Sequence, residues 1–245
     1  MAKLIFNYSA MNSGKTMDLI RTAFNYEERD GKVLVMKSKR DKKGINEIQT
    51  RAGLTRKVDI LIGVKDNIFK LLAGKLDNID CIFVDEAQFL TKKQVDDLLI
   101  LCTEIDIDVI CYGLRTDYRG VTFPGSAELL NKASELHEFR TLCRCKEIAR
   151  FNARKENGEY VIKGKQVVID GTKNVEYEPL CEKCFVEKVM MKDPSMKKHV
   201  EESLTEIYKS MKTKEVGEKN KVLAKTLWYR EKYVIIYLGG FGNGR

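Results

Sequence analysis

A short apolar run near the start of the chain leads into a small-residue loop and then into Gly14-Lys15-Thr16, and this order of features narrows the choice of folds sharply. Residues 4–8 predict a buried strand, and apolar side chains recur at helical spacing over residues 18–29. A loop between a strand and a helix can bind phosphate through its backbone N–H groups and the positive end of the helix. Ser9 stands where the usual G-x-x-x-x-G-K-[ST] pattern has Gly, which is tolerated if the Ser9 backbone keeps a negative φ.

Apolar runs and helical patterns alternate along the first 140 residues. Buried strands are predicted at 4–8, 32–36, 80–86 and 108–114, and helices at 18–29, 66–76 and 91–102. The last of these helices opens with a Thr91–Gln94 capping box, and the charged residues 39–57 predict a loop. Alternation of this kind is typical of an α/β fold, here a P-loop (RecA-like), mostly parallel sheet flanked by helices. Ligands of such sheets bind at the carboxyl ends of the strands.

A second motif carries two carboxylates. The run at 80–84 ends in Asp85 and Glu86, like the Walker-B segment of nucleotide-binding proteins, and we expect it to lie beside the first strand. Lys15 would then reach the β- and γ-phosphates, and the Thr16 hydroxyl and Asp85 would serve Mg²⁺. Glu86 could accept a proton from an attacking hydroxyl or water. The two motifs together favour a Mg-nucleotide enzyme over a solvated Asp-Glu pair.

Four of the seven cysteines form two close pairs, in C-x-C and C-x-x-C spacing. They are Cys143, Cys145, Cys181 and Cys184. Two such pairs are typical of a structural four-thiolate zinc site, whose metal has no open position. The pairs are 35 residues apart, so zinc would clip the base of a long loop that can fold over a ligand. Cys81, Cys102 and Cys111 lie in apolar runs and are expected in the core.

The predicted domain organisation has three parts. Residues 1–140 form the nucleotide-binding domain, residues 141–190 a small zinc-stapled, β-rich domain with a hairpin at 160–169, and residues 191–245 a basic tail. The tail opens with a helix at Asp193-Pro194-Ser195, whose apolar stripe is Val200, Leu204, Ile207 and Met211. Below, residues 141–190 are called the cysteine unit.

Charge and hydropathy limit the partners. The formal net charge of +8 is concentrated in residues 191–245, which carry 12 Lys and Arg against 7 Asp and Glu, whereas residues 1–140 carry 22 against 21. That balance disfavours a nucleic-acid partner. No apolar run approaches the ~20 residues of a membrane span, and no signal sequence precedes the first strand. We therefore expect a cytoplasmic protein with reduced cysteines.

Aromatic residues follow the carboxyl ends of the predicted strands. Phe89 comes after the two carboxylates, Tyr118 and Phe123 follow the strand that ends at Leu114, and Tyr177 precedes the second cysteine pair. Together they predict a slot for a planar ring, although any one of them could equally close the core.

At this point the chain resembles zinc-containing thymidine kinases of type II. The segments that carry the likeness are Y8-S-A-M-N-S-G-K-T16, F83-V-D-E-A-Q-F-L90, G113-L-R-T-D-Y-R-G120 and the two cysteine pairs. They run in order from about Lys3 to Phe185, and Ser at position 9 is normal in that family. The resemblance implies ATP-dependent 5′-phosphorylation of thymidine in nucleotide salvage, with deoxyuridine also accepted and Mg²⁺ required. It also implies feedback inhibition by dTTP and a homotetramer.

The resemblance further implies roles for individual residues. Glu86 would be the general base on the 5′-hydroxyl. ATP and Mg²⁺ would be bound by Ser9, Ala10, Met11, Asn12, Ser13, Gly14, Lys15, Thr16 and Asp85. Thymidine would contact Met11, Gln88, Phe89, Leu114, Arg119, Phe123, Asn152, Val168, Ile169, Asp170, Gly171 and Tyr177. The loop between the cysteine pairs resembles the family's lasso, whose backbone at 168–171 reads the edge of the base, and Arg51 matches a position near the site.

Two other classes of function stay open. The D-E-A-Q sequence and the basic charge also fit a nucleic-acid-stimulated P-loop ATPase with a zinc module, although only one nucleotide-binding core fits ahead of the cysteine unit. A zinc-ribbon binding module with a regulatory nucleotide site would bind ATP without any small-molecule acceptor.

Overall fold

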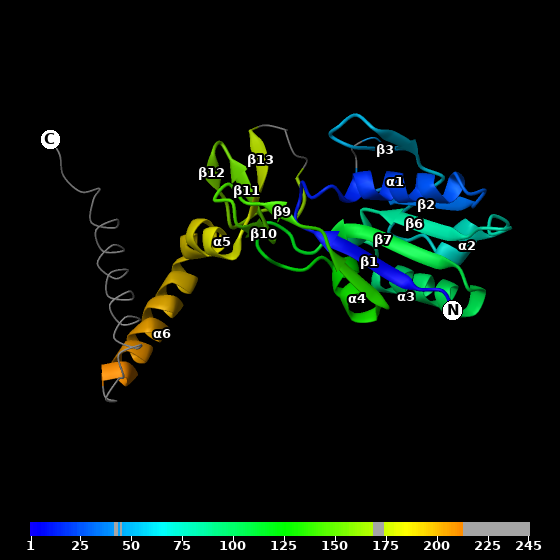
Figure 1. Cartoon of the computed structure of the whole chain (residues 1–245). Helices are drawn as coiled ribbons and strands as arrows, with labels where there is room; N and C mark the ends of the chain where they lie inside the picture. The colour runs from blue at the N-terminus through cyan, green and yellow to red at the C-terminus, as the bar shows by residue number, and fades with distance from the viewer. Residues whose placement is uncertain (42–43, 45, 169–173, 213–245) are drawn as a thin grey trace. The chain divides into compact units, whose positions relative to one another are not determined.

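A parallel sheet of six strands forms the centre of the N-terminal part of the chain, in the order β5-β2-β6-β7-β1-β8. Figure 1 labels the four inner strands of this sheet, β2, β6, β7 and β1. The strands are β1 (Leu4–Ser9), β2 (Val33–Ser38), β5 (Ile60–Ile62), β6 (Cys81–Asp85), β7 (Asp108–Leu114) and β8 (Glu135–Glu138). Neighbouring strands are parallel throughout this sheet. The computed structural model describes residues 1–41, 44, 46–168 and 174–212.

Helices cover both faces of the sheet (Figure 1). On one face, Leu19 and Ala23 of α1 (Lys15–Glu27) pack against a core that includes Phe83 and Tyr112. The other face is covered by α2 (Ile68–Leu72), α3 (Lys92–Ile100) and α4 (Pro124–Lys132). Alternate strand residues point to opposite faces, so a sheet buried on both sides needs continuous apolar runs. This is why the strands could be read from the sequence.

The predicted strands at 4–8, 32–36, 80–86 and 108–114 are confirmed as β1, β2, β6 and β7. The capping box is confirmed as well, since the Gln94 backbone N–H donates to Thr91 Oγ1 and the Thr91 N–H donates to Gln94 Oε1. The three remaining cysteines, Cys81, Cys102 and Cys111, are buried in the core as expected. The first two helices are also confirmed, although α2 is shorter than its pattern suggested.

Some elements were missed or wrongly predicted. The supposed loop 39–57 contains a hairpin of β3 (Glu47–Gln49) and β4 (Thr55–Lys57). Strands β5 and β8 and helix α4 were not predicted either. Strands of three or four residues span too few positions for an alternating pattern to be recognised.

The prediction that the two motif-bearing strands are neighbours in the sheet is wrong. Strand β6 does not lie beside β1, because β7 lies between them. The order of strands depends on how the crossovers pack, which a motif in one strand does not specify. All three strands still end at the same edge: Ser9 pairs with Leu114, and Val84 pairs with Cys111 three residues earlier in β7. The carboxyl ends therefore meet as the functional prediction requires.

The cysteine unit contains small antiparallel sheets. They are formed by β9 (Thr141–Leu142) with β10 (Ile148–Ala149), and by β11 (Phe151–Glu156) with β12 (Glu159–Tyr160) and β13 (Val175–Leu180), followed by helix α5 (Glu182–Lys188). The predicted hairpin at 160–169 is wrong, because Tyr160 pairs back with Lys155 and no strand occupies residues 161–168. The carbonyls of Lys163 and Lys165 accept hydrogen bonds from the Arg154 side chain instead of from a strand.

The chain divides into two units between Met190 and Met191. The second contains α6 (Pro194–Lys212), which begins where the sequence predicted, with the Ser195 N–H donating to Asp193 Oδ1. Leu204 and Ile207 of the predicted stripe are 44% and 46% exposed, and the side chain of Met211 lies outside what is described. None of the helices among residues 1–41, 44, 46–168 and 174–212 has the length and apolar character of a membrane span.

We expect the substitution Gly125→Ala to lower the free energy of unfolding by about 2–3 kcal/mol. A Cβ at this position in α4 would lie 2.4 Å from the Ala87 carbonyl oxygen and 2.9 Å from that of Gln88. These are backbone atoms of the turn η1 (Ala87–Phe89), which cannot move aside as a flexible side chain can. Urea-induced unfolding measures the effect. Asn131→Ala, at an exposed position of the same helix, should change stability by less than about 0.5 kcal/mol, and equal stability of the two variants would contradict this packing.

Candidate active site

A cavity of about 520 Å³ lies at the carboxyl edge of the sheet. Its lining comes from the loop after β1, the segments after β6 and β7, the hairpin β3–β4 and the cysteine unit. The predicted site residues in that lining are Met11, Asn12, Ser13, Gly14, Lys15, Thr16, Asp85, Glu86, Gln88, Phe89, Leu114, Phe123, Asn152, Val168 and Tyr177, together with Arg51. Ser9, Ala10 and Arg119 lie outside the lining. Ile169, Asp170 and Gly171 are outside the described residues.

The loop after β1 is organised by Lys15 and Ser9. Ser9 is the last residue of β1 and does not have a positive φ. A side chain is therefore tolerated where the P-loop pattern has Gly. Its hydroxyl lies 2.6 Å from the Ala10 carbonyl oxygen and 2.5 Å from Ser13 Oγ. Lys15 Nζ donates to Ser9 Oγ at 2.6 Å and to the Ala10 carbonyl at 3.0 Å. The loop thus places the half-buried Lys15 ammonium group at the start of helix α1.

The ionisable groups of this region share a poorly solvated environment. Burial raises the pKa of Asp85 to about 7, and the neighbouring Glu86 carboxylate adds to the rise. Burial also raises the pKa of Glu86, with Asp41 adding to the effect. Burial lowers the pKa of Lys15 to about 8, against the attraction of Glu86 and Asp85. Such a site favours a cation that would neutralise the carboxylates and an anion that would pair with Lys15.

Glu86 is held in an unusual backbone conformation. Its φ of 53° and ψ of 38° lie in the left-handed region, and the turn η1 starts immediately after it. Backbone strain of this kind is often found at functional sites. The Glu86 carboxylate accepts a hydrogen bond of 2.5 Å from Gln88 Nε2, and Gln88 Oε1 accepts from the Leu114 N–H at 3.1 Å. Gln88 was predicted to contact the nucleoside, but its fully buried amide is engaged in linking Glu86 to β7.

The aromatic residues that were expected to form a slot do converge on the cavity. Phe89, Tyr118, Phe123 and Tyr177 all line it. The Phe89 and Phe123 rings pack edge to face with centroids 5.7 Å apart, and the Arg40 guanidinium lies 5.3 Å from the Phe89 ring centroid. Edge-to-face packing leaves ring surface available for another planar group.

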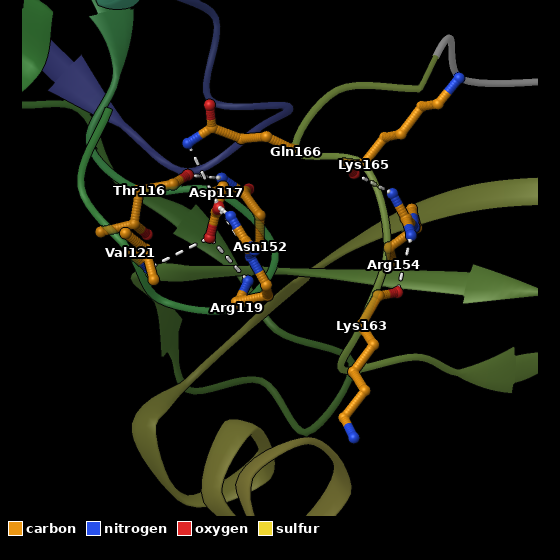
Figure 2. A network of polar contacts seen from close by, with 9 residues as sticks. All are labelled: Thr116, Asp117, Arg119, Val121, Asn152, Arg154, Lys163, Lys165 and Gln166. Carbon is orange, nitrogen blue, oxygen red and sulfur yellow. Dashed lines mark hydrogen bonds and ion pairs between the residues drawn. The ribbon is translucent and has the colours of Figure 1, made fainter. Parts of the chain in front are cut away.

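Asn152 connects the cysteine unit to the sheet edge. Its Oδ1 accepts a hydrogen bond from the Met11 N–H at 2.8 Å. Its Nδ2 donates to the Thr116 carbonyl at 3.1 Å (Figure 2). Asn152 is 2% exposed. Its amide therefore joins strand β11 to the loop after β1 and to the segment after β7. The predicted site residue Asn152 lines the cavity with both ends of its amide already bonded.

Asp117 and Arg154 were missed by the sequence reasoning. The buried Asp117 carboxylate accepts from the Arg119 and Val121 N–H groups, from the Arg119 guanidinium and from Gln166 Nε2 (Figure 2). Arg119, predicted to contact the nucleoside, is ion-paired to Asp117. Arg154 is 1% exposed on a strand. The signal that could have revealed it is the rarity of a fully buried arginine, but the F-N-A-R-K-E sequence of β11 has neither an apolar run nor an alternating pattern from which burial could be predicted.

The four predicted metal-ligating cysteines come together. The Sγ atoms of Cys143, Cys145, Cys181 and Cys184 all lie within 4.8 Å of one another. Thiolates around a tetrahedral zinc ion with Zn–S bonds of ~2.3 Å are about 3.8 Å apart, so the cluster fits that ion. Three of these cysteines are buried. The cluster is compatible with a structural zinc ion that joins the turn before β10 to the start of α5.

The fold and the cavity define a P-loop nucleotide-binding α/β protein with a four-cysteine unit. A family model described as thymidine kinase matches residues 2–185. The chain belongs to the thymidine kinase family. The thymidine kinase of Francisella tularensis subsp. tularensis (strain SCHU S4) is 40% identical over 196 residues, which cover 77% of this chain and 99% of that protein. The thymidine kinase of Coxiella burnetii (strain RSA 493 / Nine Mile phase I) is 42% identical over 190 residues, which cover 76% of this chain and 95% of that protein.

The thymidine kinase of Ruegeria pomeroyi is 39% identical over 203 residues, which cover 81% of this chain and all of that protein. A crystal structure of Bacteroides Pif1 bound to ssDNA has a TM-score of 0.31 and 15% identity, covering 56% of this chain and 38% of that one. That likeness is too slight to indicate a function.

Proposed function

We propose that this protein transfers the γ-phosphate of ATP to the 5′-hydroxyl of thymidine and gives dTMP and ADP, with deoxyuridine as a second acceptor. The observation that carries the proposal is that Lys15, Asp85 and Glu86 line the same cavity as four aromatic side chains. One cavity therefore offers both phosphate-binding groups for ATP and a slot for the planar base of a nucleoside. Family membership supports the same reaction.

In the proposed reaction, Glu86 accepts the proton of the 5′-hydroxyl while the 5′-oxygen bonds to the γ-phosphorus and the bond to the ADP oxygen breaks. Lys15 binds the β- and γ-phosphates, and the backbone N–H groups of residues 11–16 surround the phosphate chain. Mg²⁺, when bound with ATP, would be held by Thr16 and Asp85 and would neutralise phosphate charge. Gln88 holds the Glu86 carboxylate in place.

The proposal extends to the cellular role, the oligomeric state and the regulation of the enzyme. The enzyme acts in the cytoplasm in pyrimidine deoxynucleotide salvage, is a homotetramer and is inhibited by dTTP. Residues 1–140 serve ATP, and the cysteine unit, residues 141–190, supplies the base-reading backbone around 168–171. Residues 191–245 form a basic tail.

A nucleoside panel tests the proposal. With labelled ATP, the purified protein should phosphorylate thymidine and deoxyuridine at least about 100-fold faster than purine nucleosides, since purines do not fit a slot built for a single ring. Lys15→Ala should lower kcat/KM for thymidine by about 10²–10³-fold. The control Lys93→Ala, at an exposed position of α3, should keep the parent activity. ATP hydrolysis that is stimulated by DNA and indifferent to thymidine would overturn the proposal.

A further inference from the structure

We propose that Arg154 is a positioning residue for the nucleoside. It holds the segment 163–165 in place, so that residues 166–168 form one wall of the cavity. The inference rests on the proposed function, because it assigns the acceptor to this cavity. It concerns residues that the family resemblance did not assign.

Arg154 is bonded to that segment on both sides of Gly164. Its Nη1 donates to the Lys165 carbonyl at 2.7 Å and its Nη2 donates to the Lys163 carbonyl at 3.2 Å (Figure 2). The guanidinium also lies 3.9 Å from the centroid of the Tyr118 ring. Tyr118 follows strand β7 and is itself part of the cavity lining. One buried cation thus connects the cysteine unit, the segment and the sheet edge.

Gly164 fits this arrangement because it brings its backbone against the guanidinium. Its φ of +125° is a conformation that L side chains rarely adopt, and a Cβ added there would lie 2.6 Å from Arg154 Nη2. Any larger residue would push the guanidinium away from the two carbonyls. The pair of Gly164 and Arg154 therefore acts as one contact.

The wall, residues 166–168, has hydrogen bonds of its own. Gln166 Nε2 donates to Asp117 Oδ2 at 3.4 Å, and the Tyr177 hydroxyl donates to the Val168 carbonyl at 3.0 Å. Gln166, Val167 and Val168 line the cavity, whereas Lys163, Gly164 and Lys165 do not. Arg154 thus acts on the wall through the backbone of the segment and without lining the cavity itself.

A guanidinium suits this task better than other side chains. Its planar fork donates in two directions at once, and it can stack on an aromatic ring while doing so. The Lys163 and Lys165 carbonyls would lose their bonds to a charged donor if Arg154 were replaced, and such bonds are stronger than those between neutral groups. Residues 163–165 would then rearrange, and this would displace residues 166–168, which form the wall of the cavity.

The test is steady-state kinetics on the zinc-loaded, full-length chain. Arg154→Met should raise the KM for thymidine at least about tenfold, while the KM for ATP and kcat stay within about threefold. Gly164→Ala, which keeps the arginine, should show the same pattern. The double variant should be no worse than Arg154→Met alone, because both changes break one contact. The control Arg150→Met removes a 42%-exposed arginine of the same unit that pairs with Glu182 and Glu138, and should leave all three constants unchanged.

Zinc content and the unfolding midpoint of each variant are measured alongside. A thymidine KM within about twofold of the parent in both Arg154→Met and Gly164→Ala overturns the inference. Equal losses in kcat and in both KM values would also overturn it, since they indicate general unfolding and not displacement of one wall. If the parent protein does not phosphorylate thymidine at all, the proposed function fails first, so the two failures are distinct.

Discussion

Replacing Glu86 with Gln is expected to lower kcat for phosphate transfer to thymidine by about 10²–10⁴-fold, the range found when a general base is removed. Glutamine has nearly the same shape but cannot accept the proton of the 5′-hydroxyl. Its side-chain carbonyl can still accept the hydrogen bond from Gln88 Nε2, so the left-handed turn at position 86 and the link to β7 should survive. The loss should therefore appear in turnover and not in folding.

Initial rates with saturating ATP and thymidine measure the effect, together with a thermal unfolding scan. The control Glu104→Gln changes an exposed glutamate at the other end of the sheet and should keep full activity. Turnover of Glu86→Gln within about threefold of the parent would show that Glu86 is not the base. A large fall in the unfolding midpoint would mean that the residue acts mainly through the fold.

Replacing Cys181 with Ser is expected to remove the zinc ion and lower the unfolding midpoint by roughly 10 °C or more. A structural zinc site contributes several kcal/mol to folding, and each kcal/mol shifts the unfolding midpoint by about 2–4 °C in a folding unit as large as Met1–Met190. The three remaining Sγ atoms, which lie within 4.8 Å of one another, would then be left as thiolates that repel one another or as poorly packed thiols. Activity should fall too, because Asn152 and Tyr177 reach the cavity from the same unit.

Metal analysis by mass spectrometry and differential scanning fluorimetry check both parts of this prediction. The matched control is Cys102→Ala, a buried cysteine outside the cluster, which should keep one zinc ion per chain. Retention of zinc in Cys181→Ser at the parent's stoichiometry would show that the ligand set is wrong. Loss of zinc without loss of stability would show that the ion does not support the fold.

Local patterns were sufficient for much of this protein because each depends on neighbouring residues alone. The inner strands of the central sheet are buried on both faces, so β1, β6 and β7 carry the apolar runs 4–6, 81–84 and 109–112. The capping box of α3 is a contact between Thr91 and Gln94, three residues apart. Strands β3, β5 and β8 are too short to show a period, and they were missed.

The residues of the candidate site also fall into those that local patterns revealed and those that they did not. Lys15, Asp85, Glu86 and the cysteine pairs could be found because the spacing of their motifs follows from the chemistry of phosphate and metal binding. The tasks of Gln88 and Arg154 could not, because each depends on a partner that the chain brings from elsewhere. Gln88 Oε1 accepts from Leu114, 26 residues away, and the Arg154 guanidinium stacks on Tyr118.

By itself, the sequence determined the fold class, the two phosphate-site motifs, the cysteine cluster and the family, because apolar periodicity and motif spacing are properties of contiguous residues. Only the tertiary structure decided that β7 lies between β1 and β6, that residues 161–168 form no strand, and that the Asn152 amide joins β11 to the loop after β1. Each of these outcomes is a choice among long-range partners for a backbone group or a buried polar side chain. That choice is made by the packing of the whole unit, which no local pattern contains.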